Sequence, residues 1–238
     1  LLEANGIIGV GIIARDVTEI KREALLRERL TAVEYANREL QAFTYGASHD
    51  LRAPLRHVRQ LVEWLKEDLR DKLTEGSIRN MELLTGSVTR MDQLIVGLLD
   101  YSRAGQGNLP IEKVSVHDLI SDIIQLLTPP KGFTIQIENA LPTLETSPCA
   151  LGQVFRNLIG NAIQHHDKTE GVIRIYSRDV DDNQIEFTVA DDGPGIPAQF
   201  HEKIFELFQT LGPQTTRGVG IGLALVRKQV YAVGGAIT

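Results

Sequence analysis

The stretch LRERLTAVEYANRELQAFTYGASHDL, residues 26–51, carries mostly apolar side chains at alternating steps of four and three residues. The positions on this register are Leu26, Leu30, Val33, Asn37, Leu40, Thr44, Ala47 and Leu51. Steps of four and three are the a and d spacing of a coiled coil, so the stretch predicts a long helix that pairs along this stripe. No strong helix breaker occurs before Pro54, and we expect the helix to run from about Asp16 to Lys66.

Two positions on the stripe, Asn37 and Thr44, are polar. They could face solvent, but an asparagine at an a position can also fix the register of a parallel dimer, and we favour the dimer. A second helix is predicted over residues 74–102, with the same spacing at Met81, Leu84, Val88, Met91, Ile95, Leu98 and Ser102. Two such antiparallel hairpins would bury both stripes in a four-helix bundle. A purely structural coiled coil also fits these heptads.

A histidine and an acid follow each other on the first helix, at His49 and Asp50. With Ala47 at position d, His49 falls at position f, which points furthest from the stripe. We therefore expect an exposed histidine and not a core residue. Pro54 removes one backbone hydrogen bond, so we expect the helix to bend just beyond this pair.

The heptads stop at SRAGQGNLP, residues 102–110, which we interpret as a linker. Beyond it the pattern mixes helices and strands. Helices are predicted at 116–127 and 149–165, and strands at 133–138, 172–178 and 185–190. This order predicts an α+β sandwich as the second domain.

Three polar motifs lie in this second domain. Asn157 and Asn161 are four residues apart and share a helix face, where amide oxygens suit a hard cation such as Mg²⁺. ADDGPGIP, residues 190–197, places an acid directly after a strand. RGVGIGLALV, residues 217–226, places glycines before a helix, where backbone amides can approach phosphate oxygens. The glycine spacing is GxGxG, which is neither the dinucleotide fingerprint nor a P-loop.

Composition excludes several other classes. The 238 residues carry a formal net charge of -6, which argues against a general nucleic-acid binder. No apolar run approaches the ~20 residues of a membrane span, so we expect no membrane segment in this chain. The single cysteine, Cys149, cannot form an internal disulfide, which fits a cytoplasmic location, and we expect it to pack as a small apolar residue. Both ends of the sequence look cut, so we expect a fragment.

Taken together, five motifs resemble, in their order, those of the sensor histidine kinases of two-component signalling, whose ATP-binding fold is shared with gyrase, MutL and Hsp90. The motifs are SHDLRAPL (48–55), NLIGNA (157–162), DDGPGI (191–196), FELF (205–208) and GVGIGL (218–223). The resemblance covers about residues 30–238. The opening stretch IIGVGIIARDVTEIKRE, residues 7–23, resembles the last strand of a PAS sensor domain joined to a signalling helix.

The resemblance implies a role for each matching residue. His49 would accept the phosphoryl group, and Asp50 would orient its imidazole and take up the proton. Asp191 would hold the adenine amino group of ATP, and Asn161 would bind Mg²⁺ with support from Asn157. The remaining nucleotide contacts would come from Gly193 and Gly195 beside adenine, and from Arg217, Gly218, Gly220, Gly222 and Leu223 beside the phosphates. Residues 205–217 would form a lid packed by two phenylalanines, Phe205 and Phe208.

The expected fold is α+β, a helical hairpin in a dimeric four-helix bundle followed by an α/β-sandwich ATP-binding domain. The expected domains are a truncated PAS-like strand (1–16), a coiled-coil signalling helix (17–42), a dimerisation and phosphotransfer domain (43–104) and a catalytic domain cut at its C-terminal end (111–238). The implied activity is autophosphorylation with Mg-ATP, followed by transfer to an aspartate of a cognate response regulator. The implied assembly is a homodimer.

Two rival functions share these features. A gyrase-like or Hsp90-like ATPase would need a glutamate to activate water where this chain has Asn157, and an amide cannot act as a base. A pseudokinase or scaffold would bind ATP without transferring phosphate. Two residues depart from the family pattern. Ala53 stands where many relatives have Thr or Asn for dephosphorylating the partner, and Gln164 replaces a frequent basic residue.

Overall fold

The computed structural model describes residues 2–3, 6–7, 18–70, 72–105, 110–181, 184–211 and 218–238, and it divides into two compact units, Leu1–Phe43 and Thr44–Thr238. At the N-terminus, the two-residue strands β1 (Leu2–Glu3) and β2 (Gly6–Ile7) pair antiparallel. The rest of the expected PAS-like strand, residues 1, 4–5 and 8–16, lies outside the described residues. The PAS-like assignment therefore stays a prediction.

The first helix, α1, spans Thr18–Asp68, within two residues of the predicted bounds at each end. Pro54 lies inside it, and the helix is continuous through the proline. A proline has no amide hydrogen, so Pro54 leaves the carbonyl group of Asp50 without its helical donor. Within the first unit, three apolar residues of the predicted stripe, Leu26, Leu30 and Val33, are exposed in the single chain.

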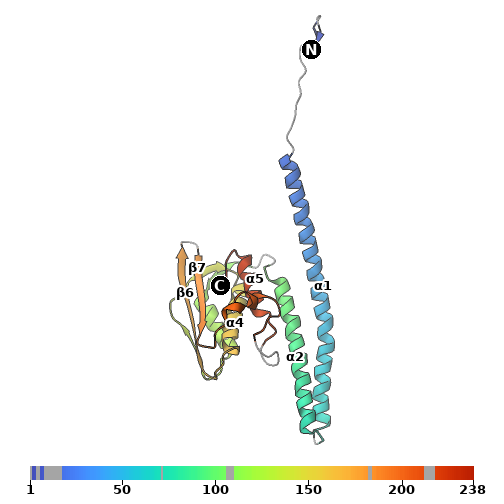
Figure 1. Ribbon diagram of the computed structural model, residues 1–238, viewed down its shortest axis with the longest axis vertical. Helices are drawn as coiled ribbons and strands as arrows, with labels where there is room; N and C mark the ends of the chain where they lie inside the picture. Colours follow the sequence, from blue (N-terminus) through green and yellow to red (C-terminus); the bar gives the residue numbers. More distant parts are fainter. Residues whose placement is uncertain are drawn as a thin grey trace. The chain divides into compact units, whose positions relative to one another are not determined.

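The second helix, α2, spans Glu75–Arg103 and begins at Thr74, whose hydroxyl accepts a hydrogen bond from the Ser77 N–H group at 3.2 Å. It runs antiparallel to the part of α1 that lies in the second unit (Figure 1). The guanidinium of Arg103, in the last turn of α2, lies 5.3 Å from the centre of the Tyr45 ring of α1. The predicted helical hairpin is confirmed.

After the hairpin, the chain mixes helices and strands, as the sequence predicts. The elements are β3 (Glu112–Ser115), α3 (Val116–Leu127), β4 (Phe133–Ile137), β5 (Thr143–Thr146), α4 (Pro148–Gln164), β6 (Gly171–Asp181), β7 (Gln184–Asp191), the 3-10 turns η1 (Ala198–Phe200) and η2 (Lys203–Phe205), and α5 (Gly222–Ala232). The strands β3 and β5, which have four residues each and pair with each other, were not predicted from the sequence.

The main sheet has the order β4-β6-β7, with β4 parallel to β6 and β6 antiparallel to β7. Alternate residues of β6, among them Ile173 and Ile175, are fully buried, which is the period-2 pattern of a strand with one covered face. They pack with Ile120 of α3 and with Phe155 and Ile159 of α4. Figure 1 shows α4 beside the long β6–β7 hairpin. This α/β sandwich confirms the predicted fold class of the second domain.

The local sequence explains where α4 begins. The Ser147 hydroxyl accepts a hydrogen bond from the Ala150 N–H group at 3.4 Å, and Pro148 occupies the first helical position. This start fixes which α4 residues face the sheet and which face away from it. Cys149, in the same turn, is exposed, so the expectation that it packs as a small apolar residue is wrong.

Candidate functional site

The His49–Asp50 pair lies on an exposed face of α1. Their side chains are 74% and 84% exposed, which agrees with the prediction of an exposed histidine at this position. The preceding Ser48 is buried, as expected where one helix face turns inward. The Nδ1 atom of His49 lies 3.2 Å from Oδ1 of Asp50. If Nδ1 carries the proton and donates it to this carboxylate, Nε2 keeps its lone pair and is free to attack an electrophile.

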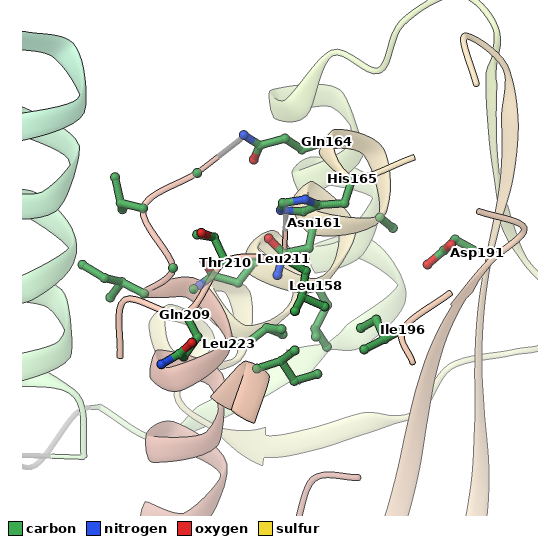
Figure 2. A pocket seen from close by; sticks show the side chains of 18 of the residues that line it. Leu158, Asn161, Gln164, His165, Asp191, Ile196, Gln209, Thr210, Leu211 and Leu223 are labelled. Atoms are coloured by element: carbon green, nitrogen blue, oxygen red, sulfur yellow. The ribbon is translucent and has the colours of Figure 1, made fainter. Parts of the chain in front are cut away.

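A second feature is a cavity of about 560 Å³ between α4, the end of β7 and the start of α5 (Figure 2). It brings together most of the residues that the motifs predicted for nucleotide binding: Asn157, Asn161, Asp191, Gly195, Gly218, Gly220, Gly222 and Leu223. Gly193 is not among the described residues that line it. Arg217 falls in 212–217, outside the described residues, so its predicted phosphate contact stays a prediction.

The two asparagines reach the cavity from one face of α4, one turn apart. The Asn157 amide donates a hydrogen bond to the Gln153 carbonyl group at 2.8 Å, so part of its hydrogen-bonding capacity is used within the helix. Its Oδ1 atom lies close to Gly222, where a Cβ atom would approach it to 2.9 Å. Asn157 therefore packs against the start of α5, and Asn161 is the asparagine better placed to bind a ligand.

Asp191 ends β7 at the edge of the cavity, away from Gln209 and Thr210 in the view of Figure 2. Its Oδ1 atom accepts a hydrogen bond from the Gly193 N–H group at 2.9 Å. A Cβ atom on Gly193 would lie 2.7 Å from the same oxygen, so a larger residue there would displace the carboxylate. Gly193 thus acts on the cavity by positioning Asp191 without lining it.

The glycine motif forms the opposite wall and runs into α5. Gly218 and Gly220 have φ values of 59° and 69°, in the left-handed region that favours glycine. At Gly220 a Cβ atom would also lie 2.5 Å from the Gln209 carbonyl oxygen. The helix α5 then begins at Gly222, and the preceding Ile221 provides no side-chain cap. The first N–H groups of α5 therefore face the cavity without an intrahelical partner, which suits a phosphate group.

Some residues at this site were missed by sequence analysis. Apolar side chains of Leu158, Ala162, Val189, Ile196, Ile204, Val219 and Ile221 line the cavity. Apolar side chains of this kind occur in a protein core as well as around a flat apolar ligand, so the sequence alone could not assign them to a site. Of the two expected lid phenylalanines, Phe205 is buried and Phe208 is 54% exposed, so Phe208 does not pack as expected.

The site suits Mg²⁺ in a particular way. Within the described part of the chain, no group of three or more His, Cys, Asp or Glu side chains could hold a metal ion by itself. Mg²⁺ commonly keeps several waters and combines one or two protein oxygens with substrate phosphates. The amide oxygen of Asn161, in the cavity that the start of α5 also lines, fits that pattern. Among the described helices, none has the length and apolar character that crossing a bilayer requires.

Comparison with known proteins supports two functional modules. Residues 39–107 match the family model described as His Kinase A (phospho-acceptor) domain, and residues 147–238 match Histidine kinase-, DNA gyrase B-, and HSP90-like ATPase. The methanogenesis regulatory histidine kinase FilI of Methanothrix harundinacea is 31% identical over 241 residues, which are 98% of this chain and 27% of that protein.

Several solved structures also resemble the chain. The crystal structure of full-length ShkA in complex with AMPPNP has a TM-score of 0.62 and 28% identity, over 81% of this chain and 41% of that one. The histidine kinase ThkA in complex with the response regulator protein TrrA has a TM-score of 0.52 over 93% of this chain and 62% of that one, and at 22% identity this likeness concerns the fold. The chain spans 27% to 30% of the length of the three curated relatives that it matches first.

Proposed function

Because the chain belongs to the sensor histidine kinase family, we propose that it transfers the γ-phosphoryl group of ATP to His49. The observation that carries this proposal is the pairing of an exposed imidazole with a carboxylate 3.2 Å from its Nδ1 atom, in a chain that also builds a nucleotide-sized cavity. The first feature supplies a nucleophile, and the second supplies a place for the phosphoryl donor.

In the proposed complex, the Asp191 carboxylate accepts a hydrogen bond from the adenine amino group at the end of β7. The polyphosphate lies along the glycine motif against the free N–H groups at the start of α5. Asn161 would hold Mg²⁺, and the ion would neutralise charge on the phosphate oxygens. Arg217 is proposed as an additional phosphate contact, from its sequence position alone.

The proposed transfer step balances in atoms and charge. Nε2 of neutral His49 attacks the γ-phosphorus atom, and the bond from that phosphorus to the β,γ-bridging oxygen breaks, so that ADP leaves. The imidazole would then carry a positive charge, and its Nδ1 proton passes to Asp50.

The site favours transfer over hydrolysis. A gyrase-like ATPase needs a base on α4 to activate water, and the α4 residue one turn before Asn161 is the amide Asn157, already bonded to the Gln153 carbonyl group. A scaffold that only binds ATP would have no use for the exposed His49–Asp50 contact. The ATPase reading therefore needs a base that the described site lacks, and the scaffold reading leaves the His49–Asp50 contact without a function.

We further propose the domain organisation and partners that the family implies. Residues 1–16 end a PAS-like domain, 17–42 form a signalling coiled coil, 43–104 the dimerisation and phosphotransfer domain, and 111–238 the catalytic domain. A homodimer would cover the exposed apolar residues of the hairpin, among them Leu61, Leu84 and Met91. The phosphoryl group would then pass to a response regulator, the class of partner bound by ThkA in its crystal structure.

The proposal is tested by incubating the chain with γ-labelled Mg-ATP and following protein-bound label. We expect label that is lost in acid and retained in alkali, as for a phosphorylated imidazole. His49→Gln should remove it, whereas His57→Gln, which changes another exposed histidine of α1, should not. Equal labelling of the His49→Gln chain would contradict the proposal.

A further inference from the structure

A second histidine, His166, is buried at the nucleotide-binding end of the catalytic domain and is not used by the proposed transfer step. It follows the last turn of α4, and its side chain is fully inaccessible to solvent. Its ring packs edge-on against Phe133 with the ring centres 5.2 Å apart. A buried imidazole must satisfy both of its ring nitrogens, so its hydrogen bonds define what it does.

The two hydrogen bonds of His166 fix its tautomer. The backbone N–H group of Lys168 donates to Nδ1 at 3.1 Å, and a backbone N–H group cannot accept. Nδ1 is therefore unprotonated in this arrangement, and Nε2 carries the hydrogen. Nε2 lies 3.0 Å from Oδ1 of Asp192, so it donates to that carboxylate. The Asp167 carboxylate is 3.7 Å from Nδ1, too far for a hydrogen bond.

Asp192 connects three elements through one oxygen atom. Its Oδ1 atom accepts both from His166 and from the Val172 N–H group, the latter at 2.7 Å. These bonds tie the end of α4, the start of β6 and the turn after β7. The Val172 N–H group first, and His166 second, lower the pKa of Asp192, which keeps it a charged acceptor. Asp192 directly follows Asp191, the residue at the edge of the cavity.

Two glycines allow the backbone to lie close to the His166 ring. A Cβ atom on Gly171 would lie 2.6 Å from Nε2, and one on Gly193 would lie 3.3 Å from Cδ2. Gly193 also donates its N–H group to Asp191. The ring is therefore enclosed by the segment that holds the adenine-binding carboxylate, and a shift of the ring would move that segment.

We propose that His166 is a positioning residue for nucleotide binding, whose Nε2–H group holds Asp192 and thereby places Asp191 at the adenine end of the cavity. The inference rests on the proposed nucleotide site and adds to it a link from α4 to the adenine-binding turn. His166 touches no nucleotide in this account and acts through Asp192.

Two substitutions of His166 test its two hydrogen bonds separately. In His166→Gln, the amide nitrogen reaches the position of Nε2 and can still donate to Asp192. In His166→Asn, the shorter amide can satisfy the Lys168 N–H group but does not reach Asp192. Dissociation constants for ATP and ADP are measured by calorimetry, together with the thermal unfolding midpoint. A matched histidine-to-asparagine control is available at the exposed His117 of α3.

We expect His166→Asn to weaken ATP binding by about tenfold or more, as for a lost hydrogen bond to a charged group, and His166→Gln to recover most of that loss. ATP and ADP should weaken by the same factor, because the adenine end is affected and the γ-phosphate is not. Asp192→Ala should reproduce the His166→Asn result, and it serves if His166→Asn does not fold, since the Asp192 side chain is half exposed.

Equal losses in His166→Gln and His166→Asn would show that the ring acts by packing alone and would overturn the inference. Wild-type affinity in both His166→Asn and Asp192→Ala would overturn it as well. If the wild-type chain itself bound no ATP, the proposed function would fail first, and this inference with it. The wild-type titration thus distinguishes the two failures.

Discussion

At the level of single residues, the proposed chemistry depends on one contact, between Nδ1 of His49 and Oδ1 of Asp50. Both side chains are largely exposed, so the contact contributes little to stability, and its value would lie in orienting the ring and accepting its proton. Asp191 has a different task, because it would recognise the base and takes no part in the transfer. Substitution of Asp50 should therefore lower the rate of phosphorylation, and substitution of Asp191 should lower the affinity for ATP.

We predict that Asp50→Asn slows phosphorylation of His49 by ~10²–10⁴, the usual contribution of a positioned acid-base group, and leaves ATP affinity unchanged. The amide is nearly isosteric and can still accept the imidazole hydrogen bond, but it cannot take the proton. The measurement is a single-turnover time course at saturating Mg-ATP, repeated at several pH values around neutrality. A wild-type rate near neutral pH would show that Asp50 is only a solvated neighbour.

We predict that Asp191→Asn abolishes ATP binding, because the carboxylate is the proposed acceptor for the adenine amino group. Calorimetric titration of ATP measures the effect, and Asp179→Asn, an exposed aspartate of β6, is the matched control. ATP affinity equal to that of the wild-type chain would remove Asp191 from the site.

At the level of elements, the cavity depends on backbone shape as much as on side chains. Gly220 has a positive φ and lies against the Gln209 backbone, and its carbonyl group accepts a hydrogen bond from the Phe208 N–H group at 2.8 Å. This bond joins the glycine motif to the segment after η2. Gly160, within α4, has open space around the position of its Cβ atom.

We predict that alanine weakens ATP binding at Gly220 and stabilises the fold at Gly160. Gly220→Ala should weaken ATP binding, because the new Cβ atom would displace the loop that faces the phosphates. Gly160→Ala should raise the free energy of unfolding by about 0.5–1 kcal/mol, the helix preference of alanine over glycine. ATP titration and urea unfolding measure the two effects. Unchanged affinity in Gly220→Ala would mean that the loop yields without consequence for the site.

The pKa of Asp192 gives a prediction about acid stability. The pKa is lowered in the folded state, by the Val172 N–H group first and His166 second. The carboxylate therefore stabilises the fold at pH above its unfolded value of ~3.9, and this stabilisation is lost as the pH falls through the folded pKa. Asp192→Asn should make unfolding less dependent on pH below ~4.5. An unchanged pH profile in that variant would contradict the assignment.

The sequence predicted the elements with strong periodicity and missed those without it. Heptad spacing placed α1 and α2 to within two residues, and the asparagine pair on α4 was recognised because a helix brings residues four apart onto one face. The strands β3 and β5 are too short for their alternation to be distinctive. The contact of His166 with Asp192 joins residues 26 apart in the chain, and no local pattern encodes such a contact.

At the level of the whole molecule, the hairpin carries apolar residues that one chain leaves uncovered. On α2, Leu84 and Met91 are exposed on the stripe that the heptads predict. A second copy of the hairpin would cover this stripe in a four-helix bundle, which is the geometry such heptads favour. The catalytic domain also has an exposed leucine, Leu126 on α3, that lies outside the stripe.

We predict that glutamate at both Leu84 and Met91 weakens the dimer, because four charges would be buried at its centre without partners. Leu126→Glu should leave the assembly unchanged, since it adds a charge to the exposed surface of the other domain. Sedimentation over a range of concentrations measures both. A double variant that stays as dimeric as the wild-type chain would place the interface elsewhere.

The proposal that this chain moves phosphate from ATP to His49 is tested most directly by locating the phosphoryl group after one turnover. The chain is incubated with an equimolar amount of Mg-ATP, digested at neutral pH and examined by mass spectrometry, while ADP and free phosphate are quantified. The account predicts phosphate on the peptide that contains His49, in an amount matching the ADP formed. Accumulation of ADP and free phosphate without phosphohistidine, or phosphate on a different residue, would contradict it.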